Sequence, residues 1–159
     1  MSEILKGPID LQTLIIREMT RADIAAVYEI EKLSFPSPWR LQDFQIEVEE
    51  HDYAITLVAE YSGEITGYLI CHALYEQFHI INIAVSPDFR SKGIAKKMLH
   101  HIESLIDKEE YIVLEVRVSN TAAIRLYQKT GYLIYFKRKK FYPDGEDALV
   151  MIKPTINQI

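Results

Sequence analysis

The sequence predicts a single α/β domain built around one mixed central sheet, with its elements in the order β-α-α-β-β-β-α-β-α-β-β. Three observations support this. The 159 residues are the length of one ordinary domain, and 48% of them are hydrophobic. Segments with the two-residue period of strands alternate with segments of helical period. We find no internal repeat, low-complexity run or linker, so we expect one domain at 13–154 after a mobile N-terminal arm at 1–12.

The first quarter of the chain predicts one strand and two helices. A short apolar strand is expected at Leu14–Arg17. Thr20 then caps a helix whose apolar residues recur at helical spacing as far as Leu33. The two prolines of Ser34–Trp39 must break that helix, because proline lacks the backbone N–H that a helix needs. A second helix is expected at Leu41–Glu49.

Three strands are expected next. Ala54–Tyr61 and Glu64–His72 are separated by Ser62-Gly63, a pair typical of a tight hairpin turn. The third, Phe78–Val85, reads FHIINIAV and is nearly all apolar and β-branched. Such a composition favours a strand that is buried on both faces.

The second half of the chain begins with a helix. Residues Ile94–Leu105 place their apolar side chains on one side. A strand is expected at Tyr111–Val118, and Ser119 or Asn120 then caps a helix that Gly131 closes. The last two predicted strands, joined by a Pro-Asp-Gly turn, are Tyr132–Phe141 and Ala148–Ile152.

Composition and charge restrict the partners and the location. The net charge of −5 argues against general nucleic-acid binding and suits a cationic substrate. Cys71 is the one cysteine, which fits a reducing compartment, and we expect it to be a core residue. Met1–Gln12 lacks the pattern of a signal peptide, and no apolar run approaches the roughly 18 residues of a membrane span. We therefore expect a cytoplasmic protein, monomeric or weakly dimeric, that binds no membrane.

The segment before the Ile94 helix has an unusual composition for a helix start. Arg90-Ser91-Lys92-Gly93 supplies two cations and a glycine where a capping side chain is usual. Unpaired N–H groups and the helix dipole make such a start attractive to an anion. Gly93 would let the backbone approach a phosphate or pyrophosphate closely. The alternative is a solvated basic loop that only begins a helix.

Several motifs resemble one enzyme family. RSKGIA, Arg90–Ala95, resembles the R/Q-x-x-G-x-G/A acyl-CoA signature of the GNAT N-acetyltransferases, and it follows a strand and opens a helix as that motif requires. NIAVSPDFRSKGIAKKML, LEVRVSNTAAIRLYQKTGY, FYPDGEDALVM and EIEKLSFPSPW resemble the ribosomal-protein alanine N-acetyltransferases (RimI type) and the archaeal N-terminal acetyltransferases. The resemblance covers roughly Leu14–Met151.

The resemblance implies a GNAT fold that binds acetyl-CoA in a V-shaped opening between the strands at Phe78–Val85 and Tyr111–Val118. Asn120 matches a position that contacts the cofactor, although it can also cap a helix. Backbone groups of three residues would hold the pantetheine arm: Ile83, Ala84 and Val85. Amides of seven would hold the pyrophosphate: Arg90, Ser91, Lys92, Gly93, Ile94, Ala95 and Lys96.

Two residues are candidates for proton transfer. Glu115 interrupts an apolar strand, where a carboxylate is costly unless it is paired or functional. The residues alone leave open a salt bridge to Arg117, and the resemblance places Glu115 on the family's general base. Tyr127 could be a packing residue, and the resemblance places it on the tyrosine that protonates the leaving sulfur.

The acceptor site is predicted from segments that border the peptide in the N-terminal acetyltransferases. One wall is Ser34–Trp39, with Phe35 and Trp39, and the other is the turn at Phe141–Asp147, with Tyr142. His79, which we place at the substrate site, is either a packed core histidine or a catalytic relay. We find no metal-site spacing and expect no metal.

We therefore expect acetyl-CoA-dependent acetylation of a protein N-terminal α-amine, most simply the N-terminal alanine of a ribosomal protein. Gln77-Phe78 replaces a Glu-Ala pair that is frequent in the RimI type, which leaves the peptide preference open. A small amine or a lysine side chain is the alternative acceptor. A non-catalytic CoA-binding module is the alternative from another class of protein, and the presence of both Glu115 and Tyr127 argues against it.

Overall fold

The computed structural model describes residues 7–107 and 110–154. Its centre is a sheet with strand order β1-β2-β3-β4-β5-β7-β6. All neighbouring strands pair antiparallel except β4 and β5, which are parallel. The predicted single mixed sheet is thus confirmed. The strands are β1 (Ile15–Glu18), β2 (Ala54–Tyr61), β3 (Glu64–Leu74), β4 (Gln77–Val85), β5 (Tyr111–Arg117), β6 (Leu133–Arg138) and β7 (Ala148–Pro154).

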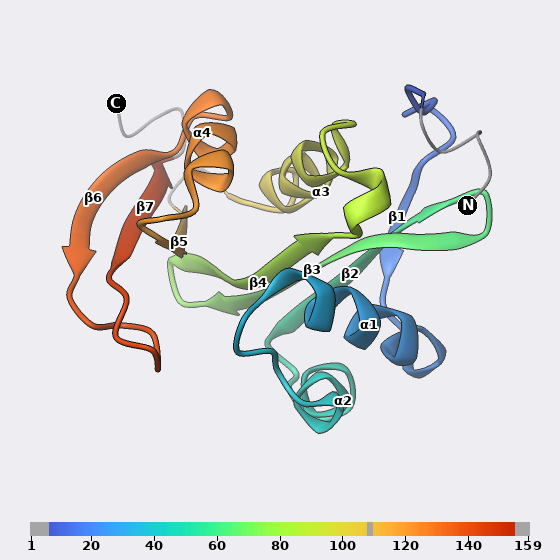
Figure 1. Cartoon of the computed structure of the whole chain (residues 1–159), viewed down its shortest axis with the longest axis horizontal. Helices are drawn as coiled ribbons and strands as arrows, with labels where there is room; N and C mark the ends of the chain where they lie inside the picture. Colours follow the sequence, from blue (N-terminus) through green and yellow to red (C-terminus); the bar gives the residue numbers. More distant parts are fainter. Residues whose placement is uncertain (1–6, 108–109, 155–159) are drawn as a thin grey trace.

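Helices cover both faces of the sheet. The first two lie on one face and the last two on the other (Figure 1). The helices are α1 (Ile24–Ser34), α2 (Leu41–Glu49), α3 (Ile94–Glu103) and α4 (Thr121–Lys129), with short 3₁₀ turns η2 (Arg21–Asp23) and η3 (Pro87–Phe89). The structure thus places every predicted element in the predicted order. No helix in the described ranges is long and apolar enough to span a membrane.

The local signals act as expected at several element ends. Ser62 and Gly63 both have positive φ, 50° and 78°, which the tight β2–β3 hairpin requires. Gly131, with φ of 98°, follows the last turn of α4. The N–H of Thr20 donates to Asp23 Oδ2 at 2.8 Å, so Thr20 begins η2, which leads directly into α1.

Two details of the predicted burial are wrong. Leu33 is 66% exposed, because the buried face of α1 turns toward Glu31 instead. Leu105 lies beyond the end of α3 and is 47% exposed. Along β4, buried residues alternate with half-buried ones. Phe78 and Ile80 join the core on one face of the sheet and Ala84 joins the core on the other, so β4 contributes to both faces, as its composition predicted.

Two apolar cores lie on the two faces of the sheet. The core under α3 and α4 includes Met98, Leu99, Ile102 and Tyr127. It also contains Cys71, where burial raises the pKa of the thiol to about 12, so the predicted core role of this cysteine is confirmed. The core under α1 and α2 is built from Met19, Ile24, Val27, Ile30, Phe44, Val58, Tyr68, Ile70 and Ala84.

Candidate active site

The sheet is split between β4 and β5. The two strands pair from Gln77 with Tyr111 to Ile80 with Leu114. Beyond that point both strands continue, but no further pairing joins them in the described residues. The facing edges therefore present N–H and C=O groups that have no partner in the sheet. Proteins rarely leave such backbone groups without a hydrogen bond when they are buried. The predicted opening between these strands is present.

A bulge in β4 accounts for the split. The register between β3 and β4 shifts so that Ile70 faces Asn82 while Cys71 faces Ile80. Ile81 is the extra residue, and it follows the last residue of β4 that pairs with β5. An extra residue bends its strand and increases the local twist. The bulge thus turns β4 away from β5 at the point where pairing ends.

The start of α3 lies beyond the end of β4. Gly93 is its N-cap with φ of 88°, and no side chain caps the helix. The first N–H groups of α3 thus lack intrahelical partners, as the sequence predicted for an anion site. Ile94 is buried in the core, so its backbone rather than its side chain is available there.

The two basic side chains of this loop are engaged by the protein. Arg90 Nε donates to the carbonyl oxygen of Val85 at 3.0 Å, and Arg90 Nη2 donates to Ser34 Oγ at 3.1 Å. Lys92 Nζ donates to the carbonyl oxygen of Gly7 at 2.5 Å. Both side chains therefore already have protein partners, and the backbone amides, to which the resemblance assigned the pyrophosphate, are the groups to consider for an anion.

The N-terminal segment contacts the same loop. Residues 1–6 of the predicted arm lie outside the described residues. In the described part, the Leu11 carbonyl oxygen accepts a hydrogen bond from Lys97 Nζ. A Cβ added to Gly93 would lie 3.2 Å from Leu11 Cδ1. Glycine is needed at this position for its left-handed backbone and for the packing of Leu11.

Glu115 lies in a cavity of about 190 Å³ on the face of the sheet opposite Tyr127. Its carboxylate Oε2 is 2.6 Å from His79 Nε2, and its Oε1 is 3.9 Å from Arg138 Nε. The Glu115 side chain is only 11% exposed. The cavity is lined by Gln77, His79, Tyr111, Val113, Glu115, Tyr135, Phe136, Arg138, Val150 and Ile152.

The salt bridge that the sequence left open as an alternative for Glu115 does not form. Arg117 Nη1 instead pairs with Asp144 Oδ2 at 2.7 Å and with Glu146 Oε1 at 3.0 Å. The carboxylate of Glu115 therefore has a histidine as its close partner. Sequence reasoning missed both His79 as that partner and Arg138, because each comes from a neighbouring part of the sheet rather than from β5.

Tyr127 lies on α4, and Tyr142 lies in the segment between β6 and β7. Burial raises the pKa of Tyr127 well above its usual range, with a smaller contribution from Tyr142. The pKa of Tyr142 is raised to about 12, chiefly by burial, and the charge of Glu115 raises it further while Arg117 lowers it. The guanidinium of Arg117 stacks on the Tyr142 ring, 4.1 Å from its centroid.

The turn that follows β6 is held by its own acids. Glu146 Oε2 accepts from the N–H of Ser119 at 2.9 Å, and Asp147 Oδ1 accepts from the N–H of Lys140 at 2.8 Å. Asn120 Oδ1 accepts from the N–H of Ala123 at 3.2 Å and so caps α4. Its helix-capping role, which the sequence allowed, is present.

A buried carboxylate fixes the other predicted wall. Glu31 is 1% exposed, and its Oε1 accepts from the N–H of Trp39 at 3.0 Å. Its Oε2 accepts from Asn82 Nδ2 at 2.9 Å and from the Tyr68 hydroxyl. Phe35 and Trp39 are half-buried against the same core. Sequence reasoning missed Glu31, although its position four residues after Val27 places it on the buried face of α1.

Comparisons with known proteins agree with this architecture. Residues 24–132 match the acetyltransferase (GNAT) family. The chain is 39% identical over 146 residues to a Bacillus subtilis (strain 168) protein provisionally named [ribosomal protein bS18]-alanine N-acetyltransferase, covering 90% of this chain and 96% of that one. It is 31% identical over 144 residues to the Escherichia coli (strain K12) [ribosomal protein bS18]-alanine N-acetyltransferase, covering 87% and 96%.

The fold agrees with solved structures of the same kind. The crystal structure of Ard1 from Thermoplasma volcanium superposes with a TM-score of 0.81 at 25% identity, covering 91% of this chain and 99% of that one. The ribosomal-protein-S18-alanine N-acetyltransferase from Escherichia coli gives a TM-score of 0.80 at 29% identity, covering 89% and 93%. The split sheet, the uncapped helix start and these relationships together show that the chain belongs to the GNAT family and is an N-acetyltransferase.

Proposed function

We propose that this enzyme transfers the acetyl group of acetyl-CoA to the α-amino group of a protein N-terminus, with the N-terminal alanine of a ribosomal protein as acceptor. The observation that carries the proposal is the buried Glu115 carboxylate in a cavity beside the split between β4 and β5. The names of the related bacterial enzymes support the acceptor. A ribosomal acceptor would place the reaction in the cytoplasm.

The donor fits the split sheet and the start of α3. Acetyl-CoA supplies an activated thioester when it is bound. The unpaired edge of β4 at Ile83 and Ala84 offers main-chain groups to the amides of a pantetheine arm, as a neighbouring strand would. Val85 contributes less, because its carbonyl oxygen already accepts from Arg90. The N–H groups from Gly93 to Lys96 suit the pyrophosphate.

Glu115 is suited to the role of general base. An α-amino group has a pKa near 7.7–8.0, so a base has to remove one proton from a group that is already close to neutrality. The Glu115 carboxylate accepts that proton directly or through a water molecule. His79 holds Oε2 at 2.6 Å, which fixes the orientation of the carboxylate in the cavity. Holding the two reactants in contact supplies the rest of the rate enhancement.

Tyr127 is suited to the role of general acid. A tyrosine phenol is protonated at neutral pH, so that Tyr127 can donate its proton to the departing sulfur. The reaction then forms the N–C bond and breaks the C–S bond without a covalent intermediate on the enzyme. Cys71 has no part in it, since it is buried in the core as an unreactive thiol.

The acceptor enters between two walls. The segment with Phe35 and Trp39 is held by Glu31, and the β6–β7 turn is held by Arg117 and its acidic partners. Tyr142, whose ring stacks on Arg117, would hydrogen-bond an incoming peptide. Because two turns rather than a deep pocket form the walls, an end-on peptide suits the site better than a compact small molecule.

A peptide assay tests the proposal. The full chain is incubated with acetyl-CoA and a peptide that begins Ala-Arg and carries one internal lysine. The matched control is the same peptide with its α-amine already blocked, and a third reaction contains a polyamine. We expect acetylation at the α-amine of the free peptide and almost none in the other two, with mass spectrometry locating the acetyl group. Predominant lysine or polyamine modification would reject the N-terminal acceptor and leave the family assignment intact.

A further inference from the structure

A cluster of three potential metal ligands lies outside the site described above. Glu47 comes from the last turn of α2, His51 follows that helix, and His72 comes from β3. Glu47 Oε2 is 3.0 Å from His51 Nδ1 and 2.8 Å from His72 Nε2. We propose that these three side chains form a binding site for a divalent transition-metal ion of the Zn²⁺ class, independent of the proposed function.

The ligand set and its spacing suit this type of ion. Two imidazoles and one carboxylate are ligands that Zn²⁺ binds in proteins, with a fourth position left to water. The three ligand atoms all lie within 4.8 Å of one another. A tetrahedral ion with bonds of about 2.1 Å holds neighbouring ligand atoms about 3.4 Å apart. Changes of up to about 1.4 Å in the distances between these atoms would therefore bring all three into coordination.

The charge of Glu47 favours an ion at this position. Its side chain is only 9% exposed, and a buried carboxylate is costly unless it is paired. In the described part of the chain, its ion-pair partners are the two histidines alone, with no lysine or arginine. Each imidazole compensates the carboxylate only when it carries a proton. A divalent cation held between the three groups would compensate it without one.

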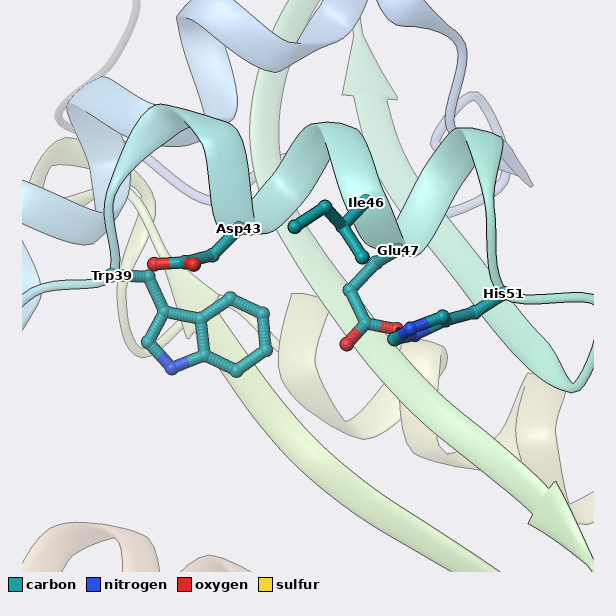
Figure 2. A pocket seen from close by; sticks show the side chains of 5 residues that line it. All are labelled: Trp39, Asp43, Ile46, Glu47 and His51. Carbon is teal, nitrogen blue, oxygen red and sulfur yellow. Dashed lines mark hydrogen bonds and ion pairs between the residues drawn. The ribbon is translucent and has the colours of Figure 1, made fainter.

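The surroundings hold the two rings in place and leave one side open. Tyr53 stacks on His51 with ring centroids 4.9 Å apart and meets the His72 ring edge-on at the same distance. An open pocket of about 350 Å³ adjoins Glu47 and His51, with Trp39, Asp43 and Ile46 as its other lining residues. Figure 2 shows Glu47 and His51 pointing toward each other on one side of α2. A water ligand has access from this pocket.

The site would fasten α2 to the sheet close to the proposed catalytic centre. His72 is the cross-strand partner of His79, and His79 contacts Glu115. The sequence predicted no metal, because we found no metal-site spacing in it; Glu47 and His51 alone are one helical turn apart. The third ligand is separated from them by a turn and a strand, which sequence spacing does not reveal.

Metal titration of untagged, chelator-treated full chain tests the proposal. We expect calorimetry to show binding of one Zn²⁺ per chain, and Co²⁺ to give the visible absorption of a tetrahedral site. Glu47→Gln keeps the size of the side chain and should weaken Zn²⁺ binding at least about tenfold, and His72→Ala should abolish the Co²⁺ spectrum. The matched control is His100→Ala on α3, which should bind like the parent.

His51→Ala guards against a variant that fails to fold. The His51 side chain is 29% exposed, so its truncation leaves little cavity, and circular dichroism confirms the fold. The site is supported if this variant loses Zn²⁺ binding. In that case Zn²⁺ should raise the Tm of the parent and of His100→Ala only. Parent-like binding in both histidine variants, or a parent that binds no Zn²⁺, overturns it.

Discussion

Replacing Glu115 with glutamine removes its charge and preserves its shape. The carboxylate is 11% exposed and lies 2.6 Å from His79 Nε2, and the amide of glutamine can still hydrogen-bond that ring. One charge-assisted hydrogen bond becomes neutral, so we expect the free energy of unfolding to fall by about 1 kcal/mol. The fold should survive, and any large loss of activity is then chemical.

The expected loss of turnover follows from the task of the base. Removing a positioned general base lowers rates by roughly 10²–10⁴-fold. An α-amino group with a pKa near 7.7–8.0 is already partly neutral at neutral pH, which favours the lower end of that range. We therefore expect about a hundredfold lower kcat, equivalent to about 2.7 kcal/mol in activation free energy. Affinity for acetyl-CoA should be unchanged.

Steady-state acetylation of the Ala-Arg peptide measures the loss of turnover, and calorimetry measures the affinity for acetyl-CoA. The matched control is Glu60→Gln, which removes a β2 carboxylate that pairs with Arg17 at 3.2 Å, away from the split in the sheet. It should turn over like the parent. If Glu115→Gln also kept the parental rate, Glu115 would be a structural partner of His79 and the proposed mechanism would be wrong.

Three further predictions test other parts of the structure. Tyr127→Phe should lower kcat with little change in peptide KM, because the phenol proton is needed only as the sulfur departs; an unchanged kcat in peptide assays would remove Tyr127 from the mechanism. Gly93→Ala should lower the free energy of unfolding by about 1–2 kcal/mol, because alanine is strained at the φ of 88° and its Cβ meets Leu11; urea denaturation measures this, and parental stability would contradict it. Asp23→Asn should cost about 2 kcal/mol at pH 7, since Arg17 lowers the pKa of the buried Asp23 carboxyl from 3.8 to about 2. A lowered folded-state pKa contributes stability above about pH 4 that is lost toward pH 2, so the difference between Asp23→Asn and the parent should vanish in acid unfolding experiments.

The elements of the fold could be predicted because their signals are local. The α2 helix begins at Leu41 and ends at Glu49 as its apolar period predicts, and the Ser62-Gly63 turn has the backbone that its residue types favour. The order in which β7 lies between β5 and β6 has no local signal, because strand pairing depends on residues far apart in the sequence. For the same reason the bulge at Ile81 could not be foreseen.

The candidate site was predictable only where a motif marks it. Arg90–Lys96 and Glu115 stand out in the sequence, whereas Glu31 and His79 acquire their roles from partners on other elements. The side chain of Arg90 shows what composition alone cannot predict. Its charge suggested an anion ligand, but in the structure it lies next to the end of β4 and donates hydrogen bonds to Val85 and Ser34. Charge can be counted along the chain, but the partner of each charge is set by the fold.

The split between β4 and β5 resolves a geometric difficulty in the proposed mechanism. Successive side chains of β5 point to opposite faces, so Leu114 and Val116 join the core that contains Tyr127 while Glu115 lies on the other face. Across a continuous sheet, an acid and a base placed in this way could not act on one pair of reactants. Because pairing ends at Ile80 and Leu114, a ligand lying between the strands would be reachable from both faces. The proposed roles of Glu115 and Tyr127 therefore depend on the extra residue in β4, because that residue ends the pairing between β4 and β5.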